Sequence, residues 1–128
     1  MQKIGMISLL VSDYDEALTF YCKVLGFVLI EDTVLTPSKR WVVVAPVGDA
    51  GCYLLLAKAA NEEQQKFVGN QTGGRVFLFM YTDDFWRDYE NLVIKKVKFV
   101  REPVNESYGT VAVFEDIYGN LWDLIERK

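Results

Sequence analysis

The chain has 128 residues, of which 51% are hydrophobic and 25% charged, and its formal net charge is −4 at pH 7. This length and composition predict one globular domain that can bury a core without help from disulfides or a structural metal. The acidic balance, with no dense basic run, argues against nucleic acid or an anionic membrane surface as a partner.

The sequence contains no histidine. Histidine is the commonest transition-metal ligand and the usual general base near neutral pH. Its absence excludes catalytic triads that depend on histidine, the HExxH zinc motif and every metal site of mixed histidine and carboxylate ligands. Any chemistry therefore has to use Asp, Glu, Lys, Tyr, Cys or Arg.

Cys22 and Cys52 lie far apart in the sequence, and neither belongs to a CxxC motif. We interpret both as free thiols, which favours a reducing compartment and hence a cytoplasmic location. The early apolar run at residues 6–11 is too short for the apolar region of a signal peptide or for a membrane span.

The first half begins with a predicted strand over residues 4–11. A helix follows, and Asp13 and Glu16 fit a capping box at its start. Apolar residues at helical spacing continue to Leu25, where Gly26 is a natural stop because it tolerates the left-handed conformation. Three further strands are predicted at residues 27–30, 41–45 and 52–57, with a loop at Pro37 and a hairpin turn within residues 47–51.

The second half repeats this order. A strand over residues 75–82 precedes a helix that is capped by Asp83 and Asp84. Three strands follow at residues 98–101, 108–114 and 120–125, with Pro103 ending the first of them. The two halves can be aligned with each other. Val11–Tyr14 then correspond to Thr82–Phe85 at the start of each helix, and Gly51 corresponds to Gly119 before each last strand.

This internal duplication predicts an α+β fold of two βαβββ modules, at residues 1–60 and 73–128, with a linker over residues 61–72. Phe85 and Trp86 cannot share one helix face, so we expect one of them to be an exposed anchor at a dimer interface or ligand rim. The loop at residues 70–72 either offers amides near a site or simply joins the halves. The stretch GDAG at residues 48–51 is interpreted as a turn rather than a phosphate loop, because no helix follows it.

The opening VSDYDEALTFYCKVLGF and the closing DIYGNLWDLIE, each within a βαβββ unit, resemble the vicinal oxygen chelate superfamily. That superfamily contains glyoxalase I, the bleomycin-resistance proteins and the extradiol dioxygenases. The resemblance covers essentially the whole chain, and it implies eight strands in two curled mixed sheets around a shared cleft, usually within a homodimer. It does not name a reaction, because the superfamily hosts several chemistries as well as pure binders.

In the metal-dependent members, the resemblance implies four ligands, one from the first and one from the fourth strand of each half. The corresponding positions here hold Met6, Leu55, Phe77 and Asp123. A slip of one residue in the fourth strand of the first half would still place a leucine there. A catalytic metal needs about three protein ligands and an open position, so we expect no metal and no other cofactor.

Alternation along the strands extends the candidate site, since every second residue shares a face. Tyr108, at the start of a strand, adds a ring that would close over a ligand. The predicted ligand-binding residues are Met6, Ser8, Tyr53, Leu55, Arg75, Phe77, Phe79, Tyr108 and Asp123, and Leu121 and Ile125 would share their face. They indicate a mostly apolar cleft in which Asp123 and Arg75 orient a small molecule. The same residues would also fit a filled cleft, in which Asp123 and Arg75 form a structural ion pair.

The function predicted from these residues is a metal-free binder of a small, partly apolar molecule, of the bleomycin-resistance type. One alternative is a glyoxalase- or dioxygenase-type enzyme with a metal bound elsewhere or at a degenerate site. A second is a metal-free lyase or isomerase in which Asp123, the best catalytic candidate, acts as the base. A third is a partner-binding or regulatory domain whose cleft is filled.

Overall fold

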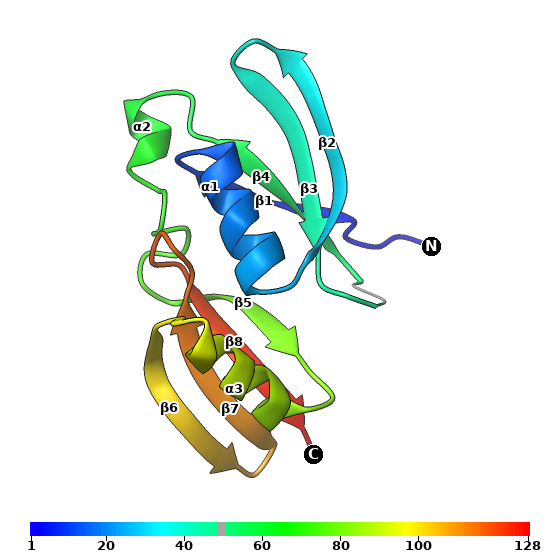
Figure 1. Ribbon diagram of the computed structural model, residues 1–128, viewed down its shortest axis with the longest axis vertical. Coiled ribbons are helices and arrows are strands. Elements are labelled where there is room, and N and C mark those ends of the chain that lie inside the picture. Colours follow the sequence, from blue (N-terminus) through cyan, green and yellow to red (C-terminus); the bar gives the residue numbers. More distant parts are fainter. Residues whose placement is uncertain (49–50) are drawn as a thin grey trace. The chain divides into compact units, whose positions relative to one another are not determined.

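A computed structural model describes residues 1–48 and 51–128 of the chain. The chain divides into two compact units, unit 1 at residues 1–68 and unit 2 at residues 69–128. Each unit holds a four-stranded mixed sheet, in the order β1-β4-β3-β2 in unit 1 and β5-β8-β7-β6 in unit 2 (Figure 1). The predicted α+β fold of two similar halves is thereby confirmed.

Unit 1 starts with a strand and a capped helix, as predicted. Its elements are β1 (Met6–Val11), α1 (Tyr14–Leu18), the π-helical η1 (Thr19–Val24), β2 (Val28–Thr36), β3 (Lys39–Ala45), β4 (Tyr53–Lys58) and α2 (Glu62–Gln65). The carboxylate of Asp13 accepts a hydrogen bond from the backbone N–H of Glu16 at 2.9 Å, and Gly26 follows the helical segment at φ 78°. The turn predicted within residues 47–51 includes residues 49–50, which lie outside the described residues.

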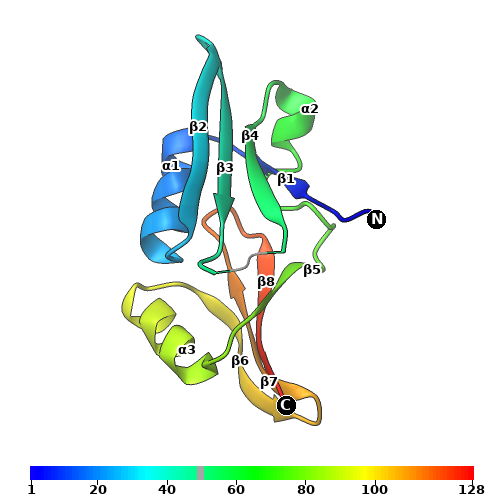
Figure 2. The same ribbon diagram turned by 90° about the vertical axis from the view of Figure 1, so that its right-hand side faces the viewer.

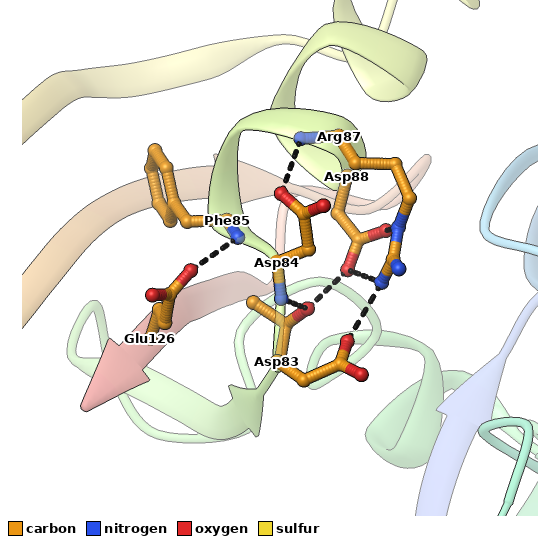
Figure 3. A network of polar contacts seen from close by, with 7 residues as sticks. Asp83, Asp84, Phe85, Arg87, Asp88 and Glu126 are labelled. Atoms are coloured by element: carbon orange, nitrogen blue, oxygen red, sulfur yellow. Dashed lines mark hydrogen bonds and ion pairs between the residues drawn. The ribbon is translucent and has the colours of Figure 1, made fainter. Parts of the chain in front are cut away.

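Unit 2 repeats the arrangement. Its elements are β5 (Val76–Tyr81), α3 (Phe85–Ile94), β6 (Phe99–Glu106), β7 (Gly109–Glu115) and β8 (Leu121–Arg127). Figure 3 shows how the start of α3 is held: Asp84 accepts from the backbone N–H of Arg87, and Glu126 on β8 accepts from that of Phe85 at 2.7 Å. Phe85 is buried and the adjacent Trp86 is exposed, as expected for two neighbouring residues that cannot share one helix face.

The edge strands β6 and β2 are longer than predicted. Strand β6 runs through Pro103, which we expected to end it. The proline is tolerated because β6 lies at the edge of its sheet, and because the pairing register with β7 shifts between Arg101 and Val104, where Pro103 stands. Strand β2 extends to Thr36 because the β2–β3 hairpin stays paired as far as Lys39 (Figure 2).

The first and fourth strands of each unit pair in parallel and in equivalent register. Ser8 lies opposite Leu55 in unit 1, and Phe79 lies opposite Asp123 in unit 2. These are the positions that the internal repeat aligns with each other. The duplication seen in the sequence is therefore also a duplication of strand pairing.

One face of each sheet packs against the main helix of its unit and forms the core. The buried residues of unit 1 include Leu9, Val11, Ala17, Tyr21, Val42, Val44, Leu54 and Leu56, and those of unit 2 include Phe85, Leu92, Ala112, Phe114, Trp122 and Leu124. Full burial of a large apolar side chain contributes about 1.5–3 kcal/mol. The opposite face carries the exposed side chains of the edge strands β1 and β5, such as Met6 and Phe79.

The closing DIYGN stretch forms a hydrogen-bonded turn in which Asp116 and Asn120 are 5% and 2% exposed. Asp116 Oδ1 accepts the backbone N–H groups of Tyr118 and Asn120 at 2.9 Å each, and its Oδ2 accepts the Asn120 side-chain amide at 2.8 Å. Asn120 Oδ1 in turn accepts the backbone N–H of Gln71 at 3.4 Å. These bonds hold residues 69–71 against the turn, which gives the loop at residues 70–72 a structural role.

Gly69 completes this contact, and its replacement provides a test. A Cβ at Gly69, where φ is 78°, would overlap the backbone carbonyl oxygen of Tyr118, whereas a Cβ at Gly73, where φ is 69°, would meet nothing within 4 Å. Gly73→Ala should therefore cost only the left-handed backbone penalty, about 1 kcal/mol. We expect Gly69→Ala to cost roughly 3 kcal/mol in the free energy of unfolding, measured in urea, because the overlapping backbone has to move. Equal losses for the two variants would contradict the proposed packing.

Candidate functional site

Strand pairing in unit 2 places Asp123 in a row that crosses the whole sheet. The row consists of Phe79 on β5, Asp123 on β8, Val113 on β7 and Arg101 on β6. Residues that pair across neighbouring strands point to the same face. Asp123 therefore projects from the face opposite α3, between an aromatic and an aliphatic side chain.

Asp123 is a half-buried carboxylate. Burial raises the pKa of Asp123 above its ordinary value, and the positive charge of Arg101 partly opposes this rise. Among the described residues, we find no hydrogen bond or ion pair that holds the carboxylate. Half-burying a charge without a direct partner costs free energy, and groups of this kind cluster at functional sites.

The positive charge that lowers the pKa of Asp123 belongs to Arg101, and the orienting role of Arg75 stays a prediction. Arg75 is exposed and precedes the first residue of β5. Strict alternation from Phe99, which pairs with Phe114 of the core, would place Arg101 on the helix-covered face. The pairing register shifts between these two residues of β6, so that Arg101 lies opposite Val113 instead. A register shift of this kind leaves no pattern in the sequence that could have identified Arg101.

The edge strand β5 supplies aromatic side chains to the same face. Phe79 and Tyr81, two positions apart, are each 58% exposed, and the Arg127 guanidinium carbon lies 4.2 Å from the centre of the Tyr81 ring. Phe77 is half-buried at a position where the β5–β8 register shifts. Ile125, which pairs with Tyr81, is 6% exposed and so belongs to the core more than to an open surface.

Unit 1 carries the other predicted residues on its corresponding face. Met6, Ser8 and Tyr53 are exposed and Leu55 is half-buried. A cavity of about 380 Å³ opens on this unit, where Val28, Ile30 and Tyr53 are among the lining residues and Lys3 supplies a positive charge. Tyr108 of unit 2 is exposed at the turn before β7, and its closure over a ligand stays a prediction.

The four positions at which the resemblance to metal-dependent members implies ligands do not fit a metal here. Met6, Leu55 and Phe77 offer one thioether and no oxygen or nitrogen donor, so Asp123 is the single hard ligand of the set. A catalytic divalent ion needs about three such ligands. In the part of the chain that the structure describes, no group of three His, Cys, Asp or Glu side chains is placed to hold a metal ion.

Comparison with known proteins assigns the family. The sequence model of the Glyoxalase/Bleomycin resistance protein/Dioxygenase superfamily matches residues 3–124. The chain belongs to this superfamily. An uncharacterized protein from Shewanella frigidimarina (strain NCIMB 400) is 60% identical over 126 residues, which cover 98% of this chain and 93% of that protein.

Solved structures extend the comparison. UcmS2 matches with a TM-score of 0.85 at 28% identity, over 98% of each chain. TnmS3, an antibiotic binding protein from Streptomyces sp. CB03234, matches with a TM-score of 0.82 at 29% identity, over 100% of this chain and 98% of that one. The superfamily predicted from the two motifs is thus confirmed. None of the helices in the described part of the chain has the length and hydropathy of a membrane span.

The raised pKa of Asp123 predicts an effect of pH on stability. Between the pKa of the unfolded chain and the higher pKa of the native state, the native state binds more protons, so stability falls as pH rises. Above the native pKa the full cost of the charged carboxylate is present. We therefore expect Asp123→Asn to raise the melting temperature at neutral pH, and the gain to vanish as pH falls below 3.8, the ordinary value for the pKa of this carboxyl.

The control is Glu90→Gln, which removes one negative charge from an exposed position on α3. It separates the burial of Asp123 from a general effect of net charge. A lower melting temperature for Asp123→Asn at neutral pH, or the same gain for both variants, would contradict this account.

Proposed function

We propose that this protein binds a small, partly apolar molecule against the exposed sheet faces, without a metal at the superfamily's ligand positions. The observation that carries the proposal is the half-buried Asp123 carboxylate, which has no hydrogen bond or ion pair among the described residues and lies between Phe79 and Val113. A few placed polar groups within apolar walls are typical of small-molecule sites. The antibiotic-binding relative TnmS3 supports the same function.

The geometry also indicates how such a ligand would be held. A ligand that covers the exposed rings of Phe79 and Tyr81 would remove apolar surface from water, at about 1.5–3 kcal/mol per ring fully covered. Asp123 would orient the ligand. A ligand that covers this carboxylate without giving it a hydrogen-bond donor leaves it unpaired, which costs free energy, so poses that place a donor there are favoured. In unit 1, Met6 and Tyr53 are exposed and Leu55 is half-buried, and they offer a separate apolar surface.

A second candidate, a metal-free lyase or isomerase, is favoured by the raised pKa of Asp123, because a general base works best when its pKa lies near the working pH. Recovery of the bound molecule separates the two functions. A binder returns it unchanged, whereas an enzyme returns a product, and Asp123→Asn would then abolish turnover more strongly than binding.

We further propose that the protein is a homodimer in the cytoplasm. Exposed apolar residues on α3, namely Trp86, Val93 and Ile94, support a homodimer. Light scattering of the purified protein would contradict this if it gave the mass of one chain. The free thiols Cys22 and Cys52 support a cytoplasmic location.

A ligand panel tests the binding function. Polycyclic aromatic and glycopeptide antibiotics are screened by the shift in melting temperature, and hits are followed by calorimetry. We expect at least one compound to stabilise the protein, and Phe79→Ala to weaken its binding by about tenfold, which corresponds to roughly 1.4 kcal/mol of lost ring contact. Leu35→Ala, an equally apolar change at an exposed position of β2, should leave binding unchanged. Equal effects of the two variants would contradict a site at Phe79.

A further inference from the structure

We propose that the face of unit 2 selects ligands that carry an organic cation, such as a protonated amine, held between the Asp123 carboxylate and the Phe79 ring. This inference rests on the proposed function and specifies the ligand class. Phe79 and Asp123 are direct partners in the parallel β5–β8 pair, so their side chains project side by side from one face. A cation placed there would contact a negative charge and the negative face of an aromatic ring together.

A neighbouring pair of residues, Tyr81 and Arg127, already makes the contact between a cation and a ring. Tyr81 is the next residue along β5 on this face, and the guanidinium of Arg127 lies over its ring, 4.2 Å from the centre. Among the described residues, no cation lies over Phe79, although its ring is as exposed as that of Tyr81. The contact between Arg127 and Tyr81 is therefore an example, within the protein, of the interaction that a ligand cation would make with Phe79, two residues earlier on β5.

The charge distribution favours a cation over an anion at this position. Asp123 lies at the centre of the row, whereas Arg101 lies two strands away, beyond the apolar Val113. Arg101 influences the Asp123 carboxylate through its charge and makes no ion pair with it within the described residues. A ligand cation would supply the missing partner, and the attraction would strengthen as the ligand displaced water from the half-buried carboxylate.

Three probes that share one ring system test the inference: naphthylmethylamine, which is cationic near neutral pH, naphthalenemethanol, which is neutral, and naphthoate, which is anionic. Their affinities are measured by titration with amide chemical shifts as the readout. We expect the amine to bind at least about tenfold more tightly than the alcohol, with the largest shifts at Phe79 and Asp123. Naphthoate should bind most weakly.

Two variants assign the selectivity to the charges of the row. Asp123→Asn should reduce the affinity for the amine to that for the alcohol, and it should fold, because it removes an unfavourable charge. Arg101→Met should strengthen amine binding, since it removes a competing positive charge. Phe79→Leu should weaken the amine more than the alcohol, because a leucine keeps apolar contact but loses the ring face.

The outcomes separate this inference from the proposed function. Equal binding of amine and alcohol in the wild type and in Asp123→Asn would overturn cation selection, while small-molecule binding at this face would stand. Tightest binding of naphthoate, lost in Arg101→Met, would overturn it in favour of an anion site. If no probe shifts the resonances of Phe79 or Asp123 at millimolar concentration, the cation site fails, and the antibiotic panel then decides the proposed function separately.

Discussion

The parallel pairing of the first and last strands in each unit is the constraint on which the other features depend. Because β1 pairs with β4 and β5 with β8, the connection after the first strand has to cross the sheet, and a helix fills that crossover. The helix covers one face, which becomes the core. The other face carries the candidate ligand contacts Met6, Ser8, Phe79 and Asp123, which are exposed or half-buried.

Asp123 illustrates how this division can place a charge where it costs stability. At the equivalent position of unit 1, Leu55 adds an apolar side chain, as expected for a sheet of this kind. In unit 2 the same position holds a carboxylate whose burial opposes its ionisation. A charge kept in such surroundings without a direct partner is a group that a ligand can stabilise, and stability given up at a site of this kind is commonly linked to function.

Several residues acquire their roles only through contacts between distant segments. Arg40 looks like part of a solvated turn in the sequence. In the structure its guanidinium binds Asp32 at 2.7 Å and Asp15 at 2.9 Å and lies over the Tyr14 ring, so it ties the β2–β3 hairpin to α1. Similarly, Asp116 and Asn120 of the closing motif form the turn that holds residues 69–71. This part of the superfamily motif is therefore structural.

Local order and chemistry could be read from the residues alone. The capping residues Asp13 and Asp84, the repeated element order and the absence of histidine were sufficient for the fold and for excluding histidine-based sites. The continuation of β6 through Pro103 and the role of Arg101 were decided only by the tertiary structure. The reason is physical: a shift in strand pairing depends on the partner strand, so it moves a side chain to the other face without changing any local pattern.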